Sequence, residues 1–176
     1  MRRILFESLV RRPLTEAWPA KDDAMLAELA GRVRHAARRR LGRSLSIREV
    51  DAGSCNGCEL EIHALNNPLY NLEALGIRFV ASPRHADLLL VTGPVSRNME
   101  VALRRTYDAT PDPKLVVAIG DCGCTGGVFG ESYASCGRVS NVIPVDVAVP
   151  GCPPTPTRLL AGILAAITAR PAGAPA

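Results

Sequence analysis

The chain from Lys114 to Gly127 reads KLVVAIGDCGCTGG, a continuous apolar run that passes directly into a glycine-rich loop. A second apolar run, ADLLLVT, occupies residues 86–92. Apolar runs of this length, bounded by turn residues, predict strands that are buried on both faces, as in parallel sheets. Residues 97–109 lie between the two runs and have the apolar periodicity of a helix. The order strand, helix, strand predicts an α/β unit.

The same alternation extends through most of the chain. Further strands are expected at residues 46–50, 77–81 and 142–149, the last of them broken by Pro144. Further helices are expected at residues 22–43, 59–66 and 155–169. The residues of helix 97–109 that are expected to face the core are Met99, Ala102, Leu103 and Tyr107. Continuous apolar strands separated by helices predict an α/β fold, with a parallel sheet and helices on both faces.

The N-terminal part of the chain is basic, whereas the remainder is slightly acidic. Residues 1–45 hold 11 of the 21 Lys and Arg residues, but only 5 of the 17 Asp and Glu residues. The helix expected at 22–43 is amphipathic, with apolar residues on one side and arginines over much of the rest. Such a helix either lies on anionic lipid or a partner, or packs on its own domain. We expect three segments: a basic arm and helix at 1–45, a folded domain at 46–169 and a disordered tail at 170–176.

Composition and charge argue against several classes of protein. The part of the chain after residue 45 has no excess of basic residues, which argues against a nucleic-acid-binding core. The start, MRRILFE, has too short an apolar run for a secretory signal, and the apolar stretch at 159–169 is too short to span a bilayer. We therefore expect a cytoplasmic chain, in which six cysteines indicate metal or redox chemistry and not disulfides.

Four cysteines lie in three short loops, each of which follows an expected strand. Cys55 and Cys58 belong to the segment SCNGCE, Cys122 to the glycine-rich loop, and Cys152 to the segment GCPP. The carboxyl ends of parallel strands share one edge of the sheet, where ligand sites of open α/β sheets gather. Thiolates are the usual protein ligands of iron–sulfur clusters, four per cluster, and glycine lets the backbone approach the sulfurs. The pattern therefore predicts a [4Fe–4S] cluster on these four cysteines.

Other kinds of site compete with a cluster for these thiols. Zinc bound by four cysteines is the main metal alternative, although structural zinc sites usually have two C-x-x-C pairs and this chain has one. In that case the chain is a non-catalytic module whose metal only holds three loops together. A thioredoxin-like dithiol is disfavoured, because one C-x-x-C pair explains neither Cys122 nor Cys152. The glycine loop also lacks the Gly-Lys-Ser/Thr sequence of a phosphate cradle.

Several further residues flank the four cysteines. Cys124 and Cys136 are surplus to a four-cysteine site. Cys124, two residues from Cys122, either exchanges as a ligand or, as we expect, is a small buried side chain, and we expect Cys136 to be a structural thiol. Glu59, Glu61 and Asp121 either relay protons and set the potential of the cluster, or cap helices and carry surface charge. The sequence does not separate these two roles.

Longer motifs around the cysteines resemble one known family, the 20-kDa subunit family of respiratory complex I and its hydrogenase relatives. The resemblance covers about residues 47–167. The matching segments are ASPRHAD at 81–87, VTGPV at 91–95, ALRRTYD at 102–108, PVD at 144–146 and PGCPP at 150–154. The resemblance implies a flavodoxin-like fold and a position beside a larger catalytic subunit. It also implies one [4Fe–4S] cluster, held by Cys55, Cys58, Cys122 and Cys152.

The first cysteine pair separates the branches of this family. Quinone-reducing complex I subunits have two adjacent cysteines here, whereas Cys55-Asn56-Gly57-Cys58 resembles the small subunits of membrane-bound [NiFe] hydrogenases of the formate hydrogenlyase and hydrogenase-4 type. The resemblance implies a relay between a ferredoxin-like subunit and the nickel–iron site of a large subunit. It further implies a complex with integral membrane subunits, on the inner face of the cell membrane. The runner-up is the cluster subunit of a quinone-reducing NADH dehydrogenase.

Overall fold

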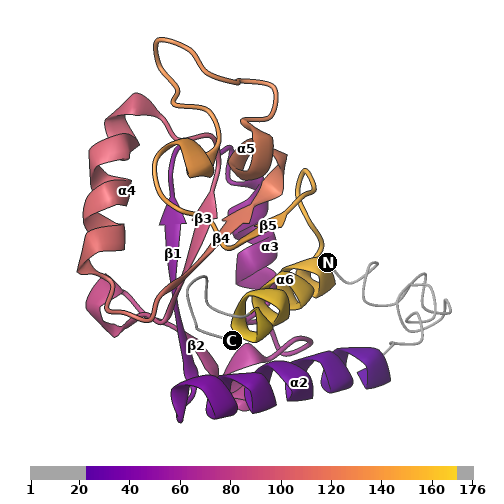
Figure 1. The fold of residues 1–176 in the computed structure, drawn as a ribbon. Helices are drawn as coiled ribbons and strands as arrows, with labels where there is room; N and C mark the ends of the chain where they lie inside the picture. Colours follow the sequence, from indigo (N-terminus) through magenta and orange to yellow (C-terminus); the bar gives the residue numbers. More distant parts are fainter. Residues whose placement is uncertain (1–22, 170–176) are drawn as a thin grey trace, which may run out of the picture.

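The computed structural model describes residues 23–169, so the arm that precedes the helix expected at 22–43 and the tail expected at 170–176 lie outside the described residues. Within this range, five parallel strands form one sheet in the order β2-β1-β3-β4-β5 (Figure 1). The strands are β1 Leu45–Asp51, β2 Ile77–Phe79, β3 Leu88–Thr92, β4 Leu115–Ile119 and β5 Val147–Val149. This is the flavodoxin-like strand order. The predicted α/β fold is confirmed.

Helices cover both faces of the sheet, as the sequence predicts. The α-helices of the described residues are α2 Asp23–Leu41, α3 Gly57–Ala64, α4 Arg97–Ala109, α5 Gly120–Thr125 and α6 Pro156–Thr168. Short 3-10 helices occur at η1 Leu72–Leu75, η2 Pro83–His85 and η3 Val139–Asn141. Helix α4 lies on one side of the sheet, and α3 and α6 lie on the other, with α2 across the end opposite α5 (Figure 1).

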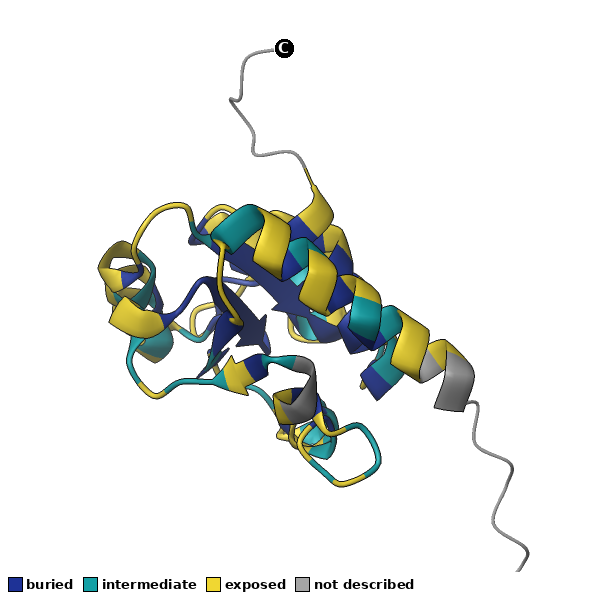
Figure 2. Ribbon diagram, turned by 90° about the horizontal axis from the view of Figure 1, so that it is seen from below, coloured by how far each residue is buried: buried dark blue, intermediate teal, exposed yellow. Residues whose placement is uncertain are grey.

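The central strands are buried on both faces, because alternate residues point to opposite helical layers. On β3, Leu88 and Leu90 join the core cluster that contains residues of α2, α3 and α6. Leu89 and Val91 join the second cluster, on the side of α4. In Figure 2 the strands accordingly form the buried centre of the molecule. This double burial is the reason that the strands read as unbroken apolar runs.

One residue expected in the core of α4 is exposed. Leu103 is fully buried, and Met99 and Tyr107 pack against the same core cluster. Ala102, in contrast, faces solvent, so its predicted inward position is wrong. A single methyl group gains little from burial, and the larger neighbour Leu103 sets the orientation of the helix.

Two segments next to the cysteines differ from their expected secondary structure. The strand expected at 142–149 is reduced to β5, because Val142 ends the turn of η3 and Pro144 has no N–H group for a strand ladder. The glycine-rich loop after β4 is instead the short helix α5. Gly120 adopts a φ of 80°, which lets the chain turn directly from strand to helix.

Helix α2 packs on its own domain, which was one of the two alternatives left open by the sequence. Ala30, Val33 and Ala37 are buried, and α2 lies against α6. The Nη1 atom of Arg40 donates hydrogen bonds to the carbonyl oxygens of Ile167 and Ala169, both at 2.9 Å, and so caps the end of α6. The division of the chain at residue 45 stays a prediction. No helix within residues 23–169 is long and apolar enough to cross a membrane.

Candidate metal centre

The four cysteines that the sequence singles out lie at the carboxyl edge of the sheet. Cys55 lies in the loop between β1 and α3, and Cys58 lies in the first turn of α3. Cys122 belongs to α5, directly after β4, and Cys152 follows β5. Cys58 interacts electrostatically with the other three cysteines, and Cys122 interacts with Cys55 and Cys152. The fold therefore gathers at one place four thiols from three separate loops.

Neighbouring thiols affect the pKa of Cys58 and of Cys122. Burial is the main cause that raises the pKa of Cys58 to about 12, and nearby Glu59 and the other three cysteines add to the shift. The pKa of Cys122 is also raised, first by burial and then by Cys152 and Cys55. The neighbouring thiols thus disfavour the ionised form of Cys58 and of Cys122, whereas a coordinating metal deprotonates its thiols outright.

Two glycines bring the backbone against the sulfurs. A Cβ atom on Gly120 would lie 2.7 Å from the Sγ of Cys58, and one on Gly127 would lie 2.8 Å from the Sγ of Cys122. Both glycines have positive φ, at 80° and 55°. A side chain at either position would therefore enter the space around the thiols and strain the backbone. The glycines form a cradle that fits a bulky group on the sulfurs.

Asp121 joins two of the cysteine loops. Its Oδ1 accepts a hydrogen bond of 2.8 Å from the backbone N–H of Gly151, and its own N–H donates one of 3.0 Å to the carbonyl oxygen of Gly151. Asp121 precedes Cys122, and Gly151 precedes Cys152. This pair of bonds, here called the Asp121–Gly151 clamp, fixes the third cysteine loop relative to the second. The sequence identified Asp121 as a neighbour of the site but did not reveal its partner.

The buried carboxylate of Glu59 is unusual. Its side chain is next to Cys58 and only 6% exposed, and neither carboxylate oxygen has a hydrogen-bond partner among the described residues. Glu49 on β1, which the sequence analysis missed, lies near it. Burial raises the pKa of Glu49, with His63 opposing the shift and Glu59 adding to it. The one signal in the sequence that could have identified Glu49 was its charge, because it lies inside an expected strand. Glu61 is half-buried, on the same helix as Glu59.

The two surplus cysteines have structural partners. The Sγ of Cys124 donates to the carbonyl oxygen of Ala118 at 3.6 Å. Cys136 is buried, and its Sγ donates to the carboxylate of Glu100 at 3.3 Å. Neither cysteine contributes to the shifted pKa of Cys58 or Cys122. Within residues 23–169, no three His, Cys, Asp or Glu side chains are grouped so that they could hold a single metal ion.

A family model decides where this chain belongs. Residues 55–166, more than half of the chain, match the model of the NADH ubiquinone oxidoreductase 20 Kd subunit. The chain belongs to this family. The matched range begins at Cys55 and includes all four cysteines of the site. The resemblance stated from the sequence is confirmed.

Relatives within the 20 Kd subunit family come from several oxidoreductase complexes. The chain is 49% identical over 127 residues to a probable membrane-bound hydrogenase subunit of Pyrococcus furiosus. The match covers 72% of this chain and 76% of that protein. It is 46% identical to formate hydrogenlyase subunit 7 of Escherichia coli over 129 residues. This match covers 73% of this chain, but only about half (51%) of the length of that relative. It is also 46% identical to one subunit of the NADH-quinone oxidoreductase of Desulfovibrio desulfuricans, over 70% of this chain and 66% of that protein.

A solved structure agrees with these relatives. A chain of the membrane-bound sulfane sulfur reductase, an archaeal respiratory membrane complex, superimposes with a TM-score of 0.62 at 32% identity. The match covers 84% of this chain and 75% of that one. The predicted class, a subunit of an oxidoreductase complex, is thereby confirmed for the family.

Proposed function

We propose that this chain is an electron-transfer subunit that holds one [4Fe–4S] cluster on Cys55, Cys58, Cys122 and Cys152. It relays electrons to or from the catalytic large subunit of a membrane-associated [NiFe]-hydrogenase-like complex and has no activity alone. One observation carries the proposal: three loops gather four thiols at one edge of the sheet, with glycine backbone against two of the sulfurs. A bound cluster accepts and releases one electron at a time.

The residues of this chain have distinct tasks at the site. Cys58 and Cys122 are half-buried and would hold the cluster from within the fold, whereas Cys55 and Cys152 are exposed and would hold it from the solvent side. Gly120 and Gly127 leave room for the cluster. An ionised carboxylate at Glu59 would place negative charge beside Cys58 and lower the reduction potential of a cluster there. Whether Glu59, Glu61 or Asp121 also relays protons stays a hypothesis.

The same edge of the molecule carries exposed apolar residues suited to a partner. Leu60 of α3 is 60% exposed, and in the loop after α5 Val128, Phe129 and Tyr133 are 99%, 63% and 98% exposed. Apolar and aromatic side chains of this kind are enriched in the core of protein–protein interfaces. We assign this surface to the large subunit, because it lies at the same edge as the exposed Cys55 and Cys152.

The branch within the family rests on the first cysteine pair and on the hydrogenase relatives. Cys55 and Cys58 are separated by Asn56 and Gly57, as in the hydrogenase branch, and two of the relatives above carry hydrogenase or hydrogenlyase names. We therefore assign a ferredoxin-like subunit and integral membrane subunits as further partners, on the inner face of the membrane. Quinone reduction is the second candidate function of the complex, because one relative is a subunit of the NADH-quinone oxidoreductase of Desulfovibrio desulfuricans. If a neighbouring gene encodes a large subunit with two C-x-x-C pairs, the complex is of the hydrogenase type. If that large subunit lacks the two pairs, quinone reduction is favoured.

Chemical analysis of the full chain, purified without oxygen, tests the cluster directly. We expect about four iron and about four acid-labile sulfide per chain, and an EPR signal of a reduced cluster after dithionite treatment. The partner surface can then be tested with the large subunit. Zinc without sulfide would instead identify a structural module held together by metal, and the electron-transfer proposal would fall.

The Asp121–Gly151 clamp gives a second expectation. Asp121→Ala removes the acceptor for the Gly151 N–H and should loosen the loop that carries Cys152, at a cost of about 0.5–1.5 kcal/mol. The cluster should then be lost several-fold faster during exposure to air, as measured by iron retention over time. Asp121→Asn keeps an oxygen acceptor at the same place and should retain iron like the wild type. Equal losses in both variants would show that the charge, and not the clamp, matters.

A further inference from the structure

An apolar groove opens between α2 and α6, far from the cysteines. It has a volume of about 990 Å³. Its apolar lining comes from Ala36, Pro113, Leu164 and Ile167, and we call it the α2–α6 groove. Helix α6 begins just after the Cys152 loop and runs for 13 residues, roughly 20 Å, before its last turn lines the groove. Helix α2, which lines the groove, lies at the end of the molecule opposite α5, which carries Cys122 (Figure 1).

The rim of the groove is basic. Arg32 and Arg39 of α2 line it and are exposed, and neither makes a hydrogen bond or ion pair with any described residue. Arg40 also lines it, but its guanidinium is already engaged with the end of α6. Glu28 is the one carboxylate among the described lining residues. Two guanidinium groups at the rim of an apolar groove therefore have no partner among residues 23–169.

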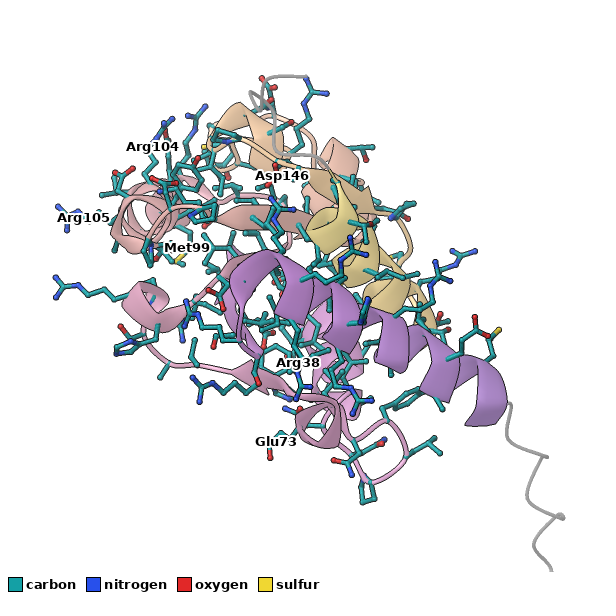
Figure 3. The ribbon with its side chains drawn as sticks, turned by 60° about the horizontal axis from the view of Figure 1, so that its bottom comes forward. Arg38, Glu73, Met99, Arg104, Arg105 and Asp146 are labelled. Atoms are coloured by element: carbon teal, nitrogen blue, oxygen red, sulfur yellow. The ribbon has the colours of Figure 1, made fainter. Side chains whose placement is uncertain are left out.

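The basic surface continues along α2 beyond the groove. Arg34 and Arg38 are exposed and likewise have no partner within residues 23–169. The outward side of α2 is exposed along most of its length (Figure 2), and Figure 3 shows Arg38 on this helix. Among the α2 residues whose burial is described, Met25 is the exposed large apolar one, at 53%. Arg32, Arg34, Arg38 and Arg39 together make this face attractive to an anionic surface.

We propose that the α2–α6 groove and the arginines around it bind anionic phospholipid at a membrane surface. Such a lipid joins a negative phosphate to an apolar acyl chain. Arg32 and Arg39 would bind the phosphate of the lipid. Its acyl chain would enter the groove between Ala36 of α2 and the α6 residues Leu164 and Ile167. Basic clusters on amphipathic helices and basic pockets between helices both favour anionic lipid headgroups. The site is independent of the proposed cluster and leaves the cysteine edge free for a protein partner.

Sedimentation of the full chain with lipid vesicles tests this site. The chain should bind vesicles that contain phosphatidylglycerol and should not bind vesicles of phosphatidylcholine alone. The double variant Arg32→Gln/Arg39→Gln should bind the anionic vesicles roughly 30-fold more weakly, about fivefold for each arginine. The iron content of this variant should equal that of the wild type, which separates a failure here from a failure of the electron-transfer proposal.

A matched variant controls for net charge. Arg84→Gln/Arg105→Gln removes two exposed arginines that also lack partners among the described residues, from η2 and α4. Figure 3 shows Arg105 projecting from α4, away from α2. This variant should bind vesicles like the wild type. Equal weakening of both double variants would overturn the proposal in favour of unspecific attraction. Binding to polyglutamate but not to the vesicles would overturn it in favour of an acidic protein.

Discussion

Cys152→Ala should leave the purified chain without an intact [4Fe–4S] cluster and should reduce electron transfer in the assembled complex to background. The side chain of Cys152 is exposed, so its loss creates no cavity and the fold should persist. The other three thiols cannot complete a four-ligand set, because each iron of the cluster takes one cysteine. Iron and sulfide analysis should show loss of the cluster, or EPR its conversion to another form. Cys122→Ala should behave in the same way.

Cys136→Ala is the matched control for the cysteine variants. Cys136 is 6% exposed and bonds to Glu100, not to the other thiols. Its replacement should lower the free energy of unfolding by about 1–3 kcal/mol, because a buried side chain and a hydrogen bond are lost. The iron content should not change. Full electron transfer in Cys152→Ala, or loss of iron in Cys136→Ala, would contradict the assignment of ligands.

Gly120→Ala should damage the site although it leaves every cysteine in place. The new Cβ would lie 2.7 Å from the Sγ of Cys58, at a backbone φ of 80° that residues other than glycine adopt only with strain. The strain alone should cost about 1–2 kcal/mol. Displacement of Cys58 should in addition lower the iron content several-fold. Urea unfolding and iron analysis measure the two effects separately.

Gly130→Ala separates the strain from the displacement of sulfur. Gly130 also has a positive φ, of 55°, but no atom lies within 4 Å of the position of its Cβ. This variant should lose a similar amount of stability and keep its full iron content. If Gly120→Ala also binds iron fully, the backbone at residue 120 does not shape the site, and the argument from the glycine cradle is wrong.

Local patterns predicted most of the fold. The runs at 86–92 and 114–119 predicted two strands that are indeed buried on both faces, because a strand between two helical layers needs apolar residues at every position. The order of strands and helices placed Cys55, Cys58, Cys122 and Cys152 at one edge, and they lie there. Where the local signal was weak, the prediction was wrong, as at Ala102, where a methyl group does not specify a face, and in the segment before β5.

The sequence by itself therefore determined the class of fold and the four cysteines at the carboxyl edge, since periodicity and the positions of cysteine and glycine are local properties of the chain. Only the tertiary structure decided which groups meet across loops. The Asp121–Gly151 clamp, the approach of Gly120 to Cys58 and the capping of α6 by Arg40 each join residues remote in sequence. The sequence also left open whether α2 packs on its own domain, because its contact with α6 joins residues that are remote in sequence. Such contacts depend on the order and spacing of packed elements, which local patterns do not encode.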